Sequence, residues 1–341
     1  MAGCLHSRIS PEGVLVVERT DATTFRFSAL DSHDADGAIV SILWDFGDGT
    51  IEAGAVRIHE YAAPGDYTVS LEVTDDDGLT ATREIVVTAY RKILVPGDFP
   101  TIQQAIDAAS NGDLILLGEQ TFTEYISFRG KTITVRGVSQ TGTTLRRPPI
   151  TEGAGPASIV TFDSGETRDA VLGNLTIQGD PWGVFGASAI RIFEASPTIR
   201  ECIISSHSAT FGGAVSVSES AALFEGNRFL DNLATVDGGA VNVEGTGTFP
   251  DFVDNEFTGN MANAGGAVCL RTRNDCTLAI NARLSTIAGN AFKSNRALGS
   301  PAAAGLTGGA LHVGCGVRIV LGENEFTANI PNDVVYEDVR L

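Results

Sequence analysis

The sequence predicts an all-β protein in which an immunoglobulin-like (Ig-like) β-sandwich is followed by a right-handed parallel β-helix. Three observations carry this prediction. Short alternating strands fill the first part, one short amphipathic helix follows them, and two motifs repeat through the second half. We divide the chain accordingly into an N-terminal tail (residues 1–11), the sandwich (12–90), a short linker (91–99) and the β-helix (100–341).

Composition narrows the function before any motif is considered. The chain has 341 residues, of which 43% are hydrophobic, and this is enough to build a sizeable core. Its net charge of −19 disfavours nucleic acid or anionic lipid as a partner. No segment approaches the roughly 18 consecutive apolar residues of a membrane span. We expect an acidic surface that keeps the protein soluble, with a saline extracellular setting as the alternative explanation.

The cysteines are candidates for anchoring and cross-linking. Met1 to Cys4 resemble the end of a bacterial lipoprotein signal, where small residues precede the lipid-modified cysteine. Cys4 is therefore a candidate lipidation site, with an ordinary cysteine as the alternative. No C-x-x-C pair is present, which disfavours a zinc knuckle. Cys269 and Cys276 are close enough in sequence to bridge a local loop, and buried free thiols are an equally good interpretation.

Residues 12–89 alternate polar and apolar residues in short runs separated by clusters of Asp, Gly and Pro. Four motifs stand out: WDFGDG at 44–49, HEY at 59–61, PGDYTV at 64–69, and VTD at 73–75 followed by Gly78. Together they closely resemble the PKD family over nearly the whole segment. The resemblance implies an Ig-like sandwich with Trp44 and Tyr67 as core anchors. It also implies an extracellular spacer or a contact to protein or glycan, without a catalytic residue.

Acidic residues gather in the loops of this segment. Asp34 and Asp36 are two residues apart, as carboxylates are in calcium loops, because Ca²⁺ takes six to eight oxygen ligands. Some PKD domains bind calcium near such a loop, so Asp34, Asp36 and Asp75 are candidate calcium ligands. The alternative, which we favour, is that these Asp residues stabilise turns by bonding their own backbone. No other cofactor is predicted.

A short amphipathic helix is predicted over residues 100–109. Thr101 and Gln104 form a capping-box pattern at its start. Its apolar face consists of Ile102, Ala105, Ile106 and Ala109. The stretch from Phe99 to Gly137 resembles the opening of pectin-lyase-like β-helices, where such a helix plugs the end of the coil. Without a plug, the first rung would expose apolar surface and unpaired strand edges.

Two motifs repeat after residue 200. Gly-Gly-Ala begins at Gly212, Gly238, Gly265 and Gly308, so the steps are 26, 27 and 43 residues. The pattern N-x-F-x-x-N begins at Asn227, Asn255, Asn290 and Asn324, with a degenerate copy from Cys202 to His207. A period in the twenties is typical of one β-helix turn. These repeats resemble those of polymorphic outer-membrane-type adhesins and related right-handed β-helix proteins.

The repeats predict two kinds of column. Residues at equivalent positions of successive rungs lie about 4.8 Å apart. The phenylalanines of the repeat should therefore stack inside the core, and its asparagines should form ladders that satisfy turn backbone groups. A glycan-binding or ice-binding Asn array is the alternative, and we favour the structural ladder.

A search for catalytic residues identifies none. The β-helix contains two lysines, and Lys131 is interpreted as a turn residue, while Lys293 lies in no carboxylate cluster. Asp231 with Asp254 or Glu256 are the candidates for a facing acid pair, but solvated surface charges are the favoured interpretation.

The histidines do not change this result, because His207 and His312 are predicted near repeat corners without a Ser or Cys partner. The sequence therefore predicts a secreted or cell-surface, non-catalytic protein with a glycan-binding, adhesion or structural role. The alternative is a polysaccharide lyase or glycoside hydrolase acting on an extracellular polysaccharide. The expected partner is a polysaccharide or a surface protein. We expect a monomer in dilute solution, with residues 331–341 covering the last rung.

Overall fold

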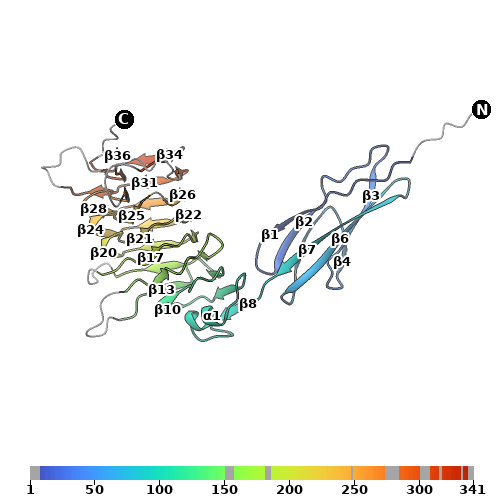
Figure 1. Cartoon of the computed structure of the whole chain (residues 1–341), viewed down its shortest axis with the longest axis horizontal. Coiled ribbons are helices and arrows are strands. Elements are labelled where there is room, and N and C mark those ends of the chain that lie inside the picture. The colour runs from blue at the N-terminus through green and yellow to red at the C-terminus, as the bar shows by residue number, and fades with distance from the viewer. Residues whose placement is uncertain are drawn as a thin grey trace, which may run out of the picture. The chain divides into compact units, whose positions relative to one another are not determined.

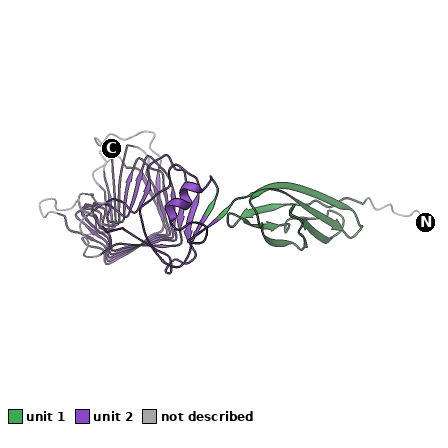
Figure 2. Cartoon of the chain, turned by 90° about the horizontal axis from the view of Figure 1, so that it is seen from below, with its two compact units in different colours: residues 1–92, 112–114 green, residues 93–111, 115–341 purple. Residues whose placement is uncertain are grey.

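The computed structural model describes residues 8–149, 157–180, 186–246, 249–272, 284–299, 308–314, 317–331 and 333–336. Its regular elements are strands, with one short helix in these ranges, and this confirms the all-β prediction. The chain divides into two compact units, one of residues 1–92 with 112–114 and one of residues 93–111 with 115–341 (Figure 2).

The first unit is an Ig-like β-sandwich of two antiparallel sheets (Figure 1). The smaller sheet has the order β1-β2-β5, with β1 (Val16–Arg19), β2 (Thr24–Ser28) and β5 (Val56–Glu60). The larger sheet has the order β4-β3-β6-β7, with β4 (Ile51–Ala53), β3 (Ile39–Asp45), β6 (Gly65–Asp75) and β7 (Thr80–Ala89).

An aromatic cluster fills the sandwich. Trp44 is fully buried, as predicted, and its Nε1 donates to the Gly54 carbonyl at 2.9 Å. Tyr67 differs from the prediction, because its ring is only half-buried and stacks on Tyr61 with a centroid separation of 4.0 Å. Tyr61 is the buried tyrosine, and its hydroxyl donates to the Phe46 carbonyl at 3.0 Å. Burial of a phenol requires such a partner.

The second unit is a right-handed parallel β-helix with four faces, which we number 1 to 4. Face 1 comprises β8 (Lys92–Val95), β9 (Leu114–Leu117), β12 (Thr134–Gly137), β15 (Val171–Gly173), β18 (Thr198–Arg200), β22 (Leu223–Glu225), β26 (Asp251–Val253), β30 (Ser285–Ala288) and β34 (Ile319–Leu321). Face 2 comprises β10 (Thr121–Thr123), β13 (Thr144–Arg146), β16 (Thr176–Gln178), β19 (Ile203–Ser205), β23 (Arg228–Leu230), β27 (Glu256–Thr258), β31 (Ala291–Lys293) and β35 (Glu325–Thr327).

The other two faces complete each turn. Face 3 comprises β11 (Ile126–Ser127), β14 (Val160–Phe162), β17 (Ile190–Phe193), β21 (Val215–Ser218), β25 (Val241–Gly245), β29 (Val268–Thr272), β33 (Leu311–Val313) and β36 (Val334–Tyr336). Face 4 comprises β20 (Ser208–Phe211), β24 (Leu233–Asp237), β28 (Met261–Ala262) and β32 (Arg296–Ala297).

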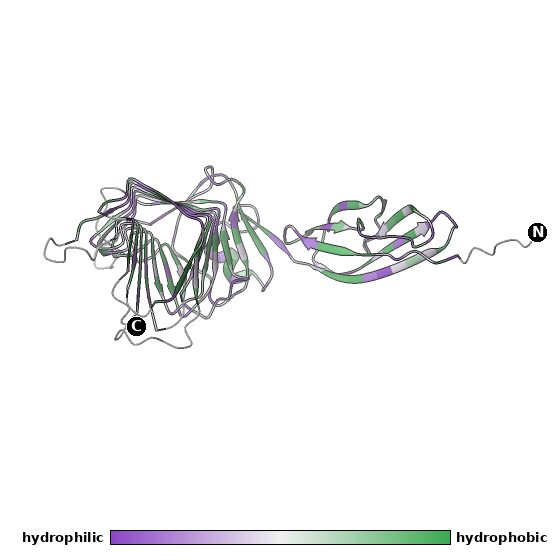
Figure 3. Ribbon diagram, turned by 90° about the horizontal axis from the view of Figure 1, so that it is seen from above, coloured by the Kyte–Doolittle hydropathy of each residue, from purple (hydrophilic) through white to green (hydrophobic). Residues whose placement is uncertain are grey.

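Successive rungs follow chain order, from the green strands beside α1 to the red β34 and β36 (Figure 1). The strands of faces 2, 3 and 4 pair in parallel from rung to rung. Hydrophobic and hydrophilic residues alternate along these short strands (Figure 3). One set of side chains therefore fills the coil, and the other faces outward.

The predicted linker at residues 91–99 contains a strand of the β-helix. Residues 92–95 form β8, the edge strand of face 1 beside β9. Ile93 and Val95 are buried in the core of the β-helix, so the alternation of this segment is that of a half-buried strand. Sequence inspection missed it because the run is short and is followed at once by Pro96-Gly97.

The predicted capping helix is present as α1 (Ile102–Ala108). Thr101 is its N-cap, and its hydroxyl accepts the backbone N–H of Gln104 at 3.3 Å. Ile102, Ala105 and Ile106 are fully buried against the first rung. A helix of this length is unstable alone, so the packing of this apolar face holds it in place.

The phenylalanine column of the repeat lies in the core, which confirms the prediction. Phe229, Phe257 and Phe292 are fully buried and stack nearly parallel. The centroid separations are 4.7 Å between Phe229 and Phe257 and 4.8 Å between Phe257 and Phe292. Phe326, in the last rung, stacks at 5.1 Å on Phe292 and is half-buried.

The asparagines form two internal ladders, which confirms the structural interpretation. The first ladder is Asn227, Asn255, Asn290 and Asn324, and the second is Asn232, Asn260, Asn295 and Asn329. Within them, the Asn255 Oδ1 accepts both the backbone N–H and the Nδ2 of Asn227, at 2.9 and 3.0 Å. Its own Nδ2 donates to the Phe224 carbonyl at 2.9 Å. Each amide thus joins two adjacent rungs and leaves few hydrogen-bonding groups for an external ligand.

The Gly-Gly-Ala motif forms the corner before β21, β25, β29 and β33 of face 3. Gly238 has φ of 64°, a conformation that glycine adopts at little cost. At Gly239, a Cβ atom would lie 2.0 Å from the carbonyl oxygen of Gly266 in the next rung. The pair is therefore required by backbone geometry and by close stacking.

Candidate functional site

The candidate calcium ligands lie at one end of the sandwich. Asp75 ends β6 and is 1% exposed. Its Oδ1 accepts the backbone N–H of Leu79 at 2.7 Å, while its Oδ2 has no hydrogen-bond partner within the described part of the chain. Asp75 thus serves as a turn residue, as the favoured interpretation predicts, but one of its oxygens is left over.

Asp34 is the second residue in this region with a buried carboxylate oxygen that lacks a partner. Its Oδ1 is buried and has no partner among the residues that the structure describes. Desolvation raises the pKa of Asp34, and the nearby carboxylates of Asp36 and Asp75 raise it further. Asp36 is exposed, and its Oδ2 accepts the backbone N–H of Ile9 at 3.1 Å. A bound cation would offset the repulsion between these carboxylates, and it would be coordinated by the two oxygens that lack a hydrogen-bond partner.

The ligand set is nevertheless incomplete as the side chains stand. Across the described ranges, no three His, Cys, Asp or Glu side chains converge on one point that would hold a metal ion. Calcium here is therefore a proposal that rests on the orphan oxygens of Asp34 and Asp75.

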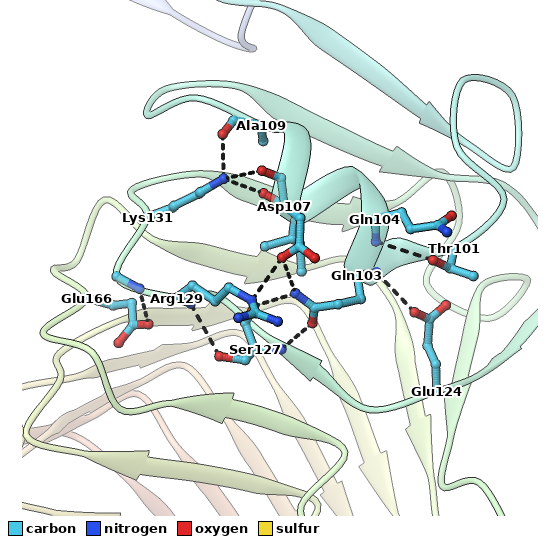
Figure 4. A network of polar contacts seen from close by, with 12 residues as sticks. Thr101, Gln103, Gln104, Asp107, Ala109, Glu124, Ser127, Arg129, Lys131 and Glu166 are labelled. Atoms are coloured by element: carbon cyan, nitrogen blue, oxygen red, sulfur yellow. Dashed lines mark hydrogen bonds and ion pairs between the residues drawn. The ribbon is translucent and has the colours of Figure 1, made fainter.

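Lys131 has a structural role at the capped end of the β-helix. Its Nζ donates to the carbonyl oxygens of Ile106, Asp107 and Ala109 at 2.7–2.8 Å, so it closes the C-terminal end of α1 (Figure 4). At the other end of α1, the Glu124 carboxylate accepts the first backbone N–H groups of the helix. Both contacts complement the helix dipole. Lys131 is thus engaged in the cap and is not placed to act as a catalytic base.

The acid pairs suggested by the sequence do not face each other. Asp231 and Asp254 both adopt positive φ at turns, but they lie at opposite ends of the face 2 strands. Glu256 lies on the outer side of face 2, 2.8 Å from the Arg228 guanidinium. Hydrogen bonding and charge from Arg228 lower the pKa of Glu256, so it stays ionised. This arrangement matches solvated, paired surface charges.

The structure brings together a polar column on face 3 that sequence inspection missed. Asn242, Cys269 and His312 occupy equivalent positions of β25, β29 and β33, and each is in register with the next. The sequence analysis placed His312 near a corner without a partner, whereas it lies within a strand beside Cys269. Alignment of the Gly-Gly-Ala repeats would have revealed this, because each residue is the second after the motif.

This column is polar and yet closed to solvent. Cys269 and His312 are fully buried and Asn242 is 8% exposed, although their neighbours Val241 and Val243 already point into the coil. A thiol next to an imidazole is a combination that can support nucleophilic chemistry. Complete burial of both groups argues against a substrate reaching them in this conformation.

The remaining cysteine and histidine candidates are structural. Cys202 is a buried free thiol, and burial raises its pKa to about 12, which suppresses thiolate reactivity. Buried His207 replaces an Asn at the start of the second ladder, where its Nε2 lies 3.1 Å from the Ile177 carbonyl oxygen. The predicted lipidation site Cys4 and the Cys276 half of the predicted bridge lie outside the described residues.

The outer side of face 2 carries several hydroxyl and charged side chains. Thr121, Thr144 and Thr176 follow one another in register on its first rungs. Ile203 follows them in the same column, and beyond it Arg228 pairs with Glu256 of the next rung. By contrast, the hollow on face 1 beside Gly173 has a volume of about 10 Å³, which holds a water molecule and no sugar ring.

A larger hollow of about 420 Å³ lies on the sandwich. It is lined by Ile39, Val40, Ser41, Ile42, Ala53 and Gly54. None of these residues is titratable, so this hollow has no acid–base chemistry.

In the described part of the chain, no helix has the length and apolar character needed to cross a membrane.

The comparisons with known proteins identify the first unit. Residues 14–89 match the family model of the PKD domain. A microbial collagenase of Vibrio alginolyticus is 40% identical over 97 residues, which cover 27% of this chain and 11% of that protein. The pre-pro-metalloprotease PrtV of Vibrio cholerae is 34% identical over 97 residues, covering 28% and 10%. The chain thus spans about a tenth of the length of these curated relatives.

Two solved structures are also similar to part of this chain. The PKD1 domain of Vibrio cholerae metalloprotease PrtV is 33% identical and covers 24% of this chain and 98% of its own, with a TM-score of 0.23. The PKD1 domain of Vibrio anguillarum Epp is 32% identical and covers 24% and 96%, also with a TM-score of 0.23. The family match ends at residue 89, before the β-helix begins.

Proposed function

Because residues 14–89 form a PKD domain, we propose that the chain is an extracellular, non-catalytic protein that binds a polysaccharide or a surface protein through its β-helix. The observation that carries this proposal is the outer side of face 2, which has a column of threonines on its first rungs and paired charges on later ones. Repeated hydroxyl and charged groups at rung spacing suit a repeating or extended partner.

The state of the charged groups supports binding over catalysis. A glycosidase needs one carboxyl group kept protonated and a second one facing it. On face 2, Glu256 has a lowered pKa and accepts hydrogen bonds from Arg228 and Thr258. Lys293 lies 3.9 Å from the Glu325 carboxylate. These residues offer hydrogen bonds and charge to a ligand, and the lowered pKa of Glu256 disfavours a role as the protonated carboxyl group of a glycosidase.

The names of the relatives support an extracellular location. A collagenase acts on an extracellular substrate, so a shared domain is consistent with secretion or display at the cell surface. A lipid anchor at Cys4 is the finer form of this proposal. Metabolic labelling of the expressed protein with a fatty acid should be lost in a Cys4→Ser variant if the anchor exists.

A polysaccharide panel tests the proposed function. Binding is measured by retardation in polysaccharide-containing gels, and cleavage by unsaturated products and new reducing ends, with and without calcium. We expect retardation without products, and weaker retardation for Arg228→Ala on face 2. Arg200→Ala, an exposed arginine on face 1, is the matched control. Products from any member of the panel would overturn the non-catalytic assignment, and absence of any retardation would limit the partner to protein.

A polysaccharide lyase, in which an imidazole would act as the base, is the second candidate. The observation in its favour is the adjacency of Cys269 and His312 on face 3. If products appear and the column of face 3 is the active site, Cys269→Ser and His312→Ala should each abolish product formation. Unchanged product formation in both variants would place the reaction elsewhere.

A further inference from the structure

The first four strands of face 2 carry no acidic residue, although the chain as a whole has 42 acidic and 23 basic residues. Each of β10, β13, β16 and β19 buries its middle side chain, so its first and third residues face outward. One of these outward residues is charged, Arg146, and the others are Thr, Gln, Ser and Ile. The first carboxylate on a strand of this face is that of Glu256 on β27. We call these four strands the acid-free half of face 2.

Two consecutive arginines lie at the end of the second of these strands. Arg146 is the last residue of β13 and is exposed, while Arg147 follows it and is half-buried. The Arg146 guanidinium donates to the neutral side-chain oxygen of Gln178 on the next rung at 2.5 Å. The Arg147 guanidinium donates to the Ala187 carbonyl at 2.5 Å. Among the residues that the structure describes, no carboxylate lies within ion-pair distance of either arginine.

Other arginines of the β-helix have a carboxylate beside them. Arg129, Arg168, Arg191 and Arg228 each pair with an Asp or Glu side chain at 2.5–3.2 Å. The contrast shows that the acidic surface of this protein neutralises arginines elsewhere on the β-helix. At Arg146 and Arg147, two adjacent positive charges have only neutral partners.

The environment of Arg147 favours a bound anion. Its Nε is buried and has no hydrogen-bond partner within the described ranges. Desolvation lowers the pKa of Arg147, but a guanidinium remains charged in proteins. Glu124, at the same corner of the first rung, is already engaged, because its carboxylate accepts the first N–H groups of α1. A partly buried charge without a counter-ion costs free energy, and an external anion would offset this cost.

We propose that Arg146 and Arg147 form a subsite for an oxyanion group of an acidic polysaccharide, either a carboxylate or a sulfate. This inference rests on the proposed function and narrows the partner to a polysaccharide with charged sugars. The Arg147 Nε–H and the remaining N–H groups of Arg146 donate to the oxyanion, in the geometry that guanidinium groups supply to such ligands. Thr121 and Thr144, in register on the same face, offer hydroxyl groups to neighbouring sugars.

The charge of the rest of the molecule limits where such a polymer can bind. The net charge of −19 repels an acidic chain at long range. Outward carboxylates directly opposite an acidic ligand would cost further free energy, and the acid-free half of face 2 has none. Binding should therefore depend strongly on Arg146 and Arg147 and weakly on exposed arginines of other faces.

Affinity electrophoresis of the full chain with matched polysaccharides tests the proposal. Alginate and its neutral propylene glycol ester share one backbone, and dextran sulfate and dextran share another. We expect saturable retardation by an acidic polymer and not by its neutral counterpart, and the two acidic polymers distinguish carboxylate from sulfate. Arg146→Gln and Arg147→Gln should each weaken this binding about tenfold, because a charge-assisted hydrogen bond is lost.

Arg200→Gln is the matched control, because Arg200 is an exposed arginine on face 1 that is in register with Glu225 of the next rung. Binding by this variant should equal that of the wild type. Retardation by neutral polymers alone, or equal binding by wild type, Arg146→Gln and Arg147→Gln, would overturn the acidic subsite and leave polysaccharide binding in place. Absence of retardation by every polymer would remove the polysaccharide partner and this inference with it.

Nuclear magnetic resonance of arginine side chains separates anion binding from a purely structural role of Arg147. The Nε–Hε signal of Arg147 is identified by its loss in Arg147→Lys. It should shift saturably with glucuronate or with glucose 6-sulfate, and not with glucose or with sodium chloride at the same ionic strength. An unmoved signal with both acidic sugars would overturn the assignment of Arg147. If Arg147→Gln loosens the corner at Ala187, the exposed Arg146→Gln keeps the binding test valid.

Discussion

The sandwich and the β-helix achieve burial in different ways. In the sandwich, a single cluster of unlike rings fills the core, such as Phe27 packed against Phe46 at 5.0 Å. In the β-helix, like residues stack on like residues from rung to rung, as Phe257 does on Phe292. The sandwich therefore depends on a few unique positions, while the β-helix depends on a repeated unit whose contacts are with its neighbours.

The two units also differ in how completely their buried polar groups are hydrogen-bonded. The sandwich leaves two buried carboxylate oxygens without described partners, on Asp34 and Asp75. The ladders of the β-helix satisfy their buried amides completely until the last rung. In the ladders, each rung supplies the hydrogen-bond partners of the next rung. An amide group without a partner is therefore expected only where the repeats start or stop.

The largest expected effect is loss of a stacked ring in the middle of the series. Phe257→Ala should lower the free energy of unfolding of the β-helix by about 3–5 kcal/mol, because a cavity opens between two rungs. Phe326→Ala is the matched control, since this ring is half-buried and has one stacked neighbour. Denaturant unfolding followed by circular dichroism measures both. Equal losses would contradict the difference between middle and end.

The second effect is a pH dependence located at the start of the ladder. Burial lowers the pKa of His207 to about 4. A depressed pKa means that the folded state favours neutral His207, so its stability is present above the unfolded value near 6.5 and is lost as pH falls through 4. The full loss is roughly 3 kcal/mol. His207→Asn should flatten the stability profile between pH 6.5 and pH 4, and an unchanged profile would refute this assignment.

A smaller effect is expected from breaking a ladder. Asn260→Ala should cost about 2–3 kcal/mol, because the Asn232 backbone N–H and the Phe229 carbonyl lose their buried partner. Asn329→Ala, at the half-exposed end, should cost about 1 kcal/mol or less, since water can replace the amide. The comparison uses thermal unfolding of both variants. A larger loss at Asn329 would mean that the last rung is covered in solution.

The smallest effect concerns the sandwich. If Ca²⁺ binds at Asp34 and Asp75, adding it at ten times its Kd should stabilise the sandwich by about 1.4 kcal/mol. Asp34→Asn removes the charge and should abolish this gain while relieving the repulsion from Asp36. Scanning calorimetry with calcium or with chelator measures both. An identical response of wild type and Asp34→Asn would place the ion elsewhere or exclude it.

Repetition also explains what could be predicted. The Phe and Asn columns were visible because equal residues recur at equal steps, and the cap was visible because Thr101 and the apolar face of α1 are local signals. The column of Asn242, Cys269 and His312 was missed, because unlike residues occupy its equivalent positions and only the register of the neighbouring repeats aligns them. The role of Lys131 was missed because its partners lie 22–25 residues earlier in the chain.

That separation has a consequence for the order in which the protein forms during synthesis. Helix α1 emerges before Glu124 and Lys131, whose side chains hold its two ends. A two-turn helix without these contacts is a poor nucleus. The growing chain must therefore complete its first full coil before the plug is secured. Until then, both edges of the first rungs have unpaired backbone groups that can pair with another chain. Slow translation of this region would prolong the exposure of these edges.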